Sequence, residues 1–179
     1  MESYLESTGR ILHGALAGMI GGAVASWVMN RYAAAQEQPV PRKSERLHKP
    51  GEQRQQPKPS GGDDATVKTA QLISRRVFDH ELTPHEKMIA GPAVHYTYGT
   101  LVGGLYGAVA EVWPLAGAGF GAMYGMTLWF LGDEAAVPAF RLGPPPTDIP
   151  ARKHADYLAT HIVYGVTLDL VRRVARHVI

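Results

Sequence analysis

The chain has 179 residues, the length of one ordinary domain, but its composition differs from that of an ordinary water-soluble domain. It contains 20 glycines, and only 19% of its residues are charged, against roughly 25% in typical soluble domains. The lack of cysteine excludes a disulfide scaffold, a thiolate metal site and a cysteine nucleophile. A net charge of +2 gives no support to nucleic-acid binding, so no nucleic-acid partner is expected.

The first apolar segment, residues 11–29, has the length of a membrane span. Its nineteen residues carry one ionisable group, His13, and would form a helix roughly 28 Å long, close to the ~30 Å hydrocarbon core of a bilayer. We therefore predict an N-terminal transmembrane helix within residues 1–32. A buried soluble helix and a removed signal peptide are the alternatives, although Glu2 and Glu6 are unlike the basic start of a signal peptide.

Two polar segments follow. Residues 33–65 are rich in proline, glutamine, lysine and glycine, and are predicted to be a disordered, basic linker. Its basic part, residues 42–58, would either touch anionic lipid headgroups or act as a solvated tether. Residues 66–82 have the apolar periodicity of an amphipathic helix, which could lie on a membrane surface or pack on the rest of the protein.

The rest of the chain, residues 83–179, predicts a helical hairpin and a C-terminal membrane helix. Thr83 and Glu86 form a capping box before a helix that Pro92 should kink. Residues 93–112 and 115–131 are two apolar helices separated by a break at Trp113 and Pro114, and residues 154–173 form a fourth helix. The predicted fold class is all-α, an integral membrane bundle of about four transmembrane helices.

Small residues recur four apart on each of the first three apolar helices. Residues at this spacing share one helix face, so each triplet leaves a groove in which another backbone can approach closely. This pattern predicts helix packing through GxxxGxxxG faces, within one chain or between chains, and a glycine-lined conduit is the alternative. The glycines are Gly14, Gly18, Gly22, Gly99, Gly103, Gly107, Gly117, Gly121 and Gly125.

Ionisable residues inside the apolar helices form a second pattern, because charged groups in a membrane normally face partners. If the helices alternate in direction, one set lies toward the membrane face that holds the N-terminus, another lies toward the opposite face, and His161 lies between them. These residues predict either a proton-responsive cluster or polar contacts that only join helices. The candidate cluster is His13, Glu111, Asp169, Arg172, His95 and His161; the opposite face also carries Asp133, Glu134, His154 and Asp156.

Motifs for catalysis are absent from the sequence. It has no H-E-x-x-H spacing, no G-x-S-x-G turn and no Walker loop. We therefore expect no catalytic residues, no metal site and no cofactor, and do not expect an enzyme.

A set of residues between positions 95 and 173 forms a pattern shared with a known family. They are His95, Tyr106, Ala110, Glu111, Val112, Trp113, Pro114, Pro138, Pro144, Pro145, Asp148, Pro150, His161, Asp169, Arg172 and Arg173. With these residues, the segment resembles the YagU-like family of small bacterial inner-membrane proteins; the linker does not match the family. The resemblance implies a multi-pass protein of the bacterial cytoplasmic membrane, loosely associated with acid survival and without an agreed biochemical activity.

The functional expectation is a non-enzymatic membrane protein, a structural or partner-binding module in acid or envelope stress. Its expected partners are membrane lipid, another membrane protein or a second copy of the chain. A proton or small-solute conduit is the alternative, followed by an intramembrane metal-dependent enzyme. The basic residues around the linker favour a cytoplasmic linker with both termini outside, whereas the arginines at the C-terminus favour the opposite orientation.

Overall fold

The computed structural model describes residues 2–36 and 64–179, and every regular element in those two ranges is helical. The predicted all-α class is therefore confirmed. Most of the predicted linker lies outside the described residues, but its first four residues continue the first helix and Ala65 begins the second. The longer helices are α1 (Glu2–Gln36), α2 (Ala65–Phe78), α3 (Pro84–Val112), α4 (Ala122–Trp129) and α6 (Ala151–Val178).

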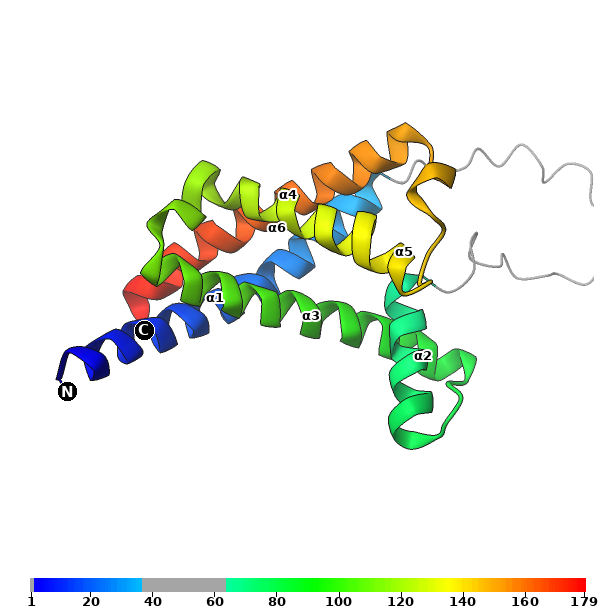
Figure 1. Cartoon of the computed structure of the whole chain (residues 1–179), viewed down its shortest axis with the longest axis horizontal. Coiled ribbons are helices and arrows are strands. Elements are labelled where there is room, and N and C mark those ends of the chain that lie inside the picture. The colour runs from blue at the N-terminus through cyan, green and yellow to red at the C-terminus, as the bar shows by residue number, and fades with distance from the viewer. Residues whose placement is uncertain (1, 37–63) are drawn as a thin grey trace, which may run out of the picture.

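The long helices form one elongated bundle (Figure 1). α1 packs against both α3 and α6, and α4 packs against α6. Both termini lie at one end of the bundle, as the predicted alternation of helix directions requires, and α2 lies crosswise at the other end against the beginning of α3 (Figure 1). We call these the terminal end and the linker end.

Among the described residues, one helix is long and apolar enough to cross a membrane, the segment Glu6–Gln36 of α1. This agrees with the first predicted span, although length and composition alone do not separate it from a buried soluble helix or a signal sequence. α4 has only eight residues, and α6 carries Asp169, Arg172 and Arg173 within its length. The four-span bundle is therefore not established by the helices themselves.

Local signals explain the ends of α2 and α3. The Asp64 side chain accepts a hydrogen bond from the Val67 amide at the start of α2, which ends four residues earlier than predicted. α3 begins with the predicted capping box, in which Thr83 and Glu86 bond each other's backbone amides. It continues through Pro92, because one lost hydrogen bond is outweighed by the packing of a 29-residue helix.

The prediction of one continuous helix over residues 115–131 is wrong. Pro114–Gly121 form a 3-10 helix that is interrupted by backbone of positive φ at Gly119, Phe120 and Gly121. Glycine adopts positive φ without strain, so Gly119 and Gly121, on either side of Phe120, permit a sharp reversal here. α4 follows, and then a wider π-helical turn, η3 (Phe130–Ala136), leads into the single turn of α5 (Val137–Ala139).

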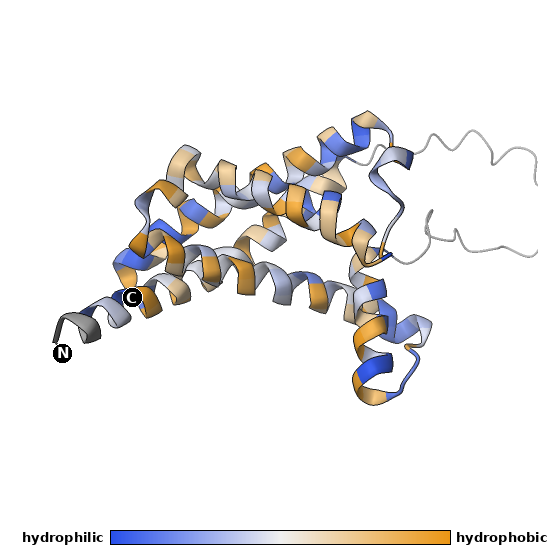
Figure 2. Ribbon diagram, in the orientation of Figure 1, coloured by the Kyte–Doolittle hydropathy of each residue, from blue (hydrophilic) through white to orange (hydrophobic). Residues whose placement is uncertain are grey.

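Polar and apolar residues are distributed in an unusual way. The buried apolar residues are few and the majority are alanine or tyrosine, whereas Asp169, Arg172 and Ser26 are buried. Large apolar side chains instead cover the outside, and hydrophobic positions recur along the exposed sides of α1, α3 and α4 (Figure 2). Water-soluble domains normally bury such residues.

Candidate functional site

Glycines bring α1 and α3 together. Gly18 lies opposite Gly103, and a Cβ atom built on either residue would fall within 2.5 Å of the other residue's carbonyl oxygen. A Cβ on Gly107 would lie 2.0 Å from the Gly14 carbonyl oxygen, and a Cβ on Gly22 would lie 2.4 Å from the Gly99 carbonyl oxygen. The six glycines of the first two predicted triplets therefore lie on one intramolecular interface, which we call the glycine seam.

The third predicted triplet does not form one stripe. Gly121 and Gly125 approach α6 closely, since a Cβ on each would lie 2.2 Å from the carbonyl oxygens of Gly165 and His161 respectively. Gly117 lies before the helix break, and a Cβ built on it would lie 3.3 Å from Arg173 Nη2. Gly165 was missed by the sequence reasoning because it stands alone in its helix, without a glycine four residues away.

An ionic cluster lies at the terminal end. The Asp169 carboxylate is completely buried and accepts hydrogen bonds from Arg172 Nη2 at 3.0 Å and Arg173 Nε at 2.8 Å. Glu111, on α3, accepts from Arg176 Nε at 2.9 Å and lies 3.7 Å from Arg172 Nη1. These five residues form the terminal ionic cluster, in which three guanidiniums face two carboxylates and α6 is joined to α3.

Aromatic rings complete the terminal ionic cluster. The Arg172 guanidinium lies 5.6 Å from the centre of the buried Tyr106 ring, and that of Arg173 lies 5.7 Å from the Phe120 ring. The predicted cluster members Glu111, Asp169 and Arg172 therefore do meet here. His13 does not join them, because its side chain is exposed on the outer side of α1.

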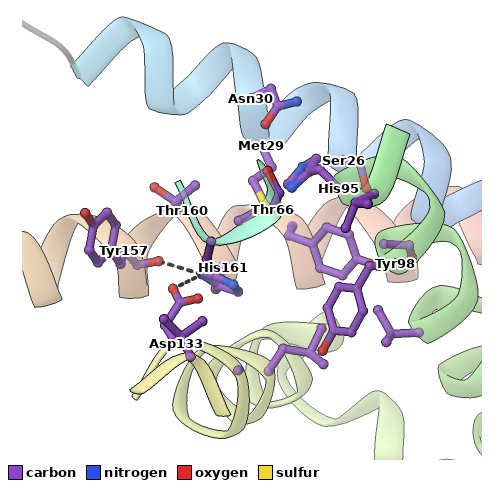
Figure 3. Close-up of a pocket in the computed structure, with 18 of the residues that line it drawn as sticks. Ser26, Met29, Asn30, Thr66, His95, Tyr98, Asp133, Tyr157, Thr160 and His161 are labelled. Atoms are coloured by element: carbon purple, nitrogen blue, oxygen red, sulfur yellow. Dashed lines mark hydrogen bonds and ion pairs between the residues drawn. The ribbon is translucent and has the colours of Figure 1, made fainter. Parts of the chain in front are cut away.

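A pocket of about 470 Å³ lies at the linker end (Figure 3). Residues from α1, α2, α3, α4, η3, α5 and α6 line it, and the predicted residues His95 and His161 are among them. His161 Nδ1 lies 2.9 Å from the Tyr157 carbonyl oxygen and 3.7 Å from Asp133 Oδ2 (Figure 3). His95 Nε2 is buried and has no hydrogen-bond partner in the described part of the chain.

The two polar sites are separate. Between them lies an apolar core built around Tyr106, Tyr164 and Leu168. The Tyr164 hydroxyl donates to the Gly99 carbonyl oxygen at 2.5 Å, which ties α6 to α3 at this level. Of the six candidate residues, Glu111, Asp169 and Arg172 thus lie together at the terminal end, His95 and His161 line the pocket, and His13 belongs to neither site.

A third ion pair lies beside the pocket, outside the apolar part of α6. His154 Nδ1 is 2.5 Å from Glu134 Oε1, and Nε2 is 3.1 Å from the Pro146 carbonyl oxygen. The hydrogen bond to Glu134 raises the pKa of His154, because only the protonated ring can donate from both nitrogens to these two oxygens. Asp156, two residues further on, offers its carbonyl oxygen to Thr160.

Among the described residues, no three histidine, aspartate or glutamate side chains are grouped closely enough to hold a metal ion. The fold and its sites thus define a class: an all-helical bundle joined by glycine contacts, with a buried ionic cluster at one end and a pocket at the other. A family described as "Protein of unknown function (DUF1440)" matches residues 34–170, so the chain belongs to that family. YagU is a member of the same family. No curated protein and no solved structure matches the chain.

Proposed function

We propose that the chain is a multi-pass integral protein of the bacterial cytoplasmic membrane that acts as a non-enzymatic structural or partner-binding module. The outward placement of apolar side chains carries this proposal. α1 exposes Leu12, Leu16 and Trp27, and α3 exposes Leu101 and Leu105, the last two by about 60% of their surface. Each of these side chains would gain roughly 1–2 kcal/mol by leaving water, which lipid provides and an aqueous surface does not.

The contacts between helices also favour lipid as the medium around the bundle. In lipid, apolar helices gain little from packing against one another, so close backbone contact and interhelical hydrogen bonds hold them together. The glycine seam supplies the first and the terminal ionic cluster supplies the second. The α3–α6 link through Glu111 and Arg176 lies near the ends of both helices, where headgroups can solvate the remaining charge.

A module is better supported than a conduit. A conduit for protons or small solutes needs a continuous polar path, and Tyr106, Tyr164 and Leu168 fill the space between the two polar sites. A metal-dependent enzyme would need a ligand group, which the described residues do not offer. Flux measurements in proteoliposomes test the conduit directly. A pH-dependent flux that disappears in Asp169→Asn would favour the conduit over the module.

Lipid and another membrane protein are the partners that fit the exposed apolar faces. The first two glycine triplets are occupied within the chain, so a partner would meet the large side chains on the outer sides of α1 and α3. Similarity to the YagU-like proteins points to acid or envelope stress as the setting. Loss of a co-purifying membrane protein in Leu105→Ala, with the bundle still folded, would support the partner-binding role.

The chain has no cysteine, so single-cysteine variants test the membrane assignment cleanly. In membranes, Leu105→Cys should resist a hydrophilic maleimide, whereas Thr147→Cys, in the exposed loop before α6, should react rapidly. In whole cells Val178→Cys should react before permeabilisation and Thr147→Cys only after it, if the linker end is cytoplasmic. Equal reactivity of positions 105 and 147, with the chain in the soluble fraction, would overturn the proposal.

A further inference from the structure

The pocket at the linker end has the size and composition of a small-molecule site. Its volume of about 470 Å³ falls within the roughly 300–1,000 Å³ typical of such sites. Apolar walls come from Val94 and Val102 on α3 and from Leu128 on α4. Tyr98 and Tyr164 add aromatic surface, and the labelled Tyr98 ring projects into the space opposite His161 (Figure 3).

Polar side chains from several elements also line the pocket, among them His95, His161 and Asp133. His161 donates a hydrogen bond from Nδ1 to the Tyr157 carbonyl oxygen, and the same atom lies 3.7 Å from Asp133 Oδ2. His95 also lines the pocket, and its Nε2 atom is buried and has no hydrogen-bond partner among the described residues. Asp133 adds a carboxylate.

The position of Asp133 depends on a rare backbone feature. It lies in η3, the π-helical turn between α4 and α5, and this turn places Gly132, Asp133 and Ala136 on the pocket wall. Single π-helical turns are uncommon and occur frequently at functional sites. A regular α-helix through the same residues would rotate this carboxylate relative to the pocket.

The charge of the pocket selects the sign of its ligand. No lysine or arginine is among the described residues that line it, so an anion would find no cationic partner. His95, His161 and Asp133 are not grouped closely enough to hold a bare metal ion. Asp133 is the one aspartate or glutamate among the described residues that line the pocket.

We propose that this pocket binds an amphiphilic primary amine in its ammonium form. The ammonium donates a hydrogen bond to the Asp133 carboxylate, and its positive charge meets the aromatic surface of Tyr98. The apolar body of the ligand lies against Val102 and the other apolar walls. This inference does not depend on the medium around the bundle.

Calorimetry on the purified full-length chain in detergent micelles tests the proposal with 1-naphthylmethylammonium as the probe. The neutral probe 1-naphthylmethanol has the same ring system and controls for partition into the micelle. The ammonium should bind saturably and roughly ten- to a hundredfold more tightly than the alcohol, the range expected for a charge-assisted hydrogen bond. The anion 1-naphthoate should bind no more tightly than the alcohol.

A matched pair of variants locates the site. Asp133→Asn keeps the shape of the side chain and should lose at least about tenfold in ammonium affinity, down to the level of the alcohol. Asp148→Asn makes the same chemical change in an exposed loop outside the pocket and should bind as the natural chain does. Equal binding of ammonium and alcohol, unchanged affinity in Asp133→Asn, or no saturable ammonium binding would each overturn the proposal.

Discussion

The glycine seam makes a prediction that separates packing from helix propensity. Gly9 and Gly18 both lie in α1, but a Cβ at position 9 would meet nothing within 4 Å. At position 18 the same atom would lie 2.2 Å from the Gly103 carbonyl oxygen and 2.9 Å from the Gly107 Cα. The first distance is more than about 1 Å short of ordinary van der Waals contact, and both neighbours are backbone. Only separation of α1 from α3 can make room.

The magnitude follows from comparing the two alanine variants. Each variant gains the same helix propensity, so this contribution cancels in the difference between them. Overpacking a close contact costs about 1–3 kcal/mol, so Gly18→Ala should be less stable than Gly9→Ala by that amount. Gly103→Ala places its Cβ against the same seam from the other side, at 2.5 Å from the Gly18 carbonyl oxygen. The double variant at positions 18 and 103 should lose less than the sum of the single losses, because one separation accommodates both methyl groups.

Unfolding in mixed micelles, followed by tryptophan fluorescence as the fraction of sodium dodecyl sulfate rises, measures these differences. Far-ultraviolet circular dichroism of each variant before unfolding checks that the helices are intact. Equal midpoints for Gly18→Ala and Gly9→Ala would refute the reasoning, since they would mean that α1 and α3 do not approach as closely as the seam requires.

The remaining predictions concern charged groups. Asp169→Asn should lower the free energy of unfolding by about 3 kcal/mol, because it leaves a buried guanidinium without its nearest carboxylate; the same micelle assay measures this, and a loss below about 1 kcal/mol would contradict it. Hydrogen bonds from Thr83 lower the pKa of Glu86 from 4.5 to about 2, so its contribution to stability is complete above pH 4.5 and is lost as the pH falls toward 2. Carbon-13 NMR should show this titration midpoint, and His80→Ala should raise it, because it removes the second hydrogen bond to the Glu86 carboxylate. The raised pKa of His154 means that its contribution is complete below pH 6.5 and is lost as the pH rises through the raised value. In Glu134→Gln the imidazole titration, followed by NMR, should return toward 6.5; an unchanged midpoint would exclude the ion pair as its cause.

Local patterns in the sequence predicted the long helices well. The capping box at Thr83, the apolar run after Arg10 and the glycine spacing of α1 and α3 are all set by neighbours within one or two helical turns. The pairing of Gly18 with Gly103 is a long-range contact, and spacing alone could not separate it from a contact between chains. The two residues are 85 positions apart in the sequence, and periodicity within a helix does not indicate contacts between residues so far apart.

The missed features share a physical cause. The four-residue spacing of Gly117, Gly121 and Gly125 suggested one helix face, but Gly119 lies among them and allows the chain to reverse. A spacing rule assumes continuous helix and therefore fails where glycine permits positive φ. The π-helical turn that places Asp133 in the pocket has no sequence signature of its own, so the sequence assigned this residue to an end of the bundle and not to a site.

The helices are held together by contacts other than a large apolar core. The described buried apolar residues are too few and too small to hold five helical elements together by hydrophobic burial in water. Close contact along the glycine seam needs no large side chains, and the terminal ionic cluster joins α3 to α6 through bonds that strengthen when water is scarce. An apolar medium outside the bundle therefore favours both kinds of contact.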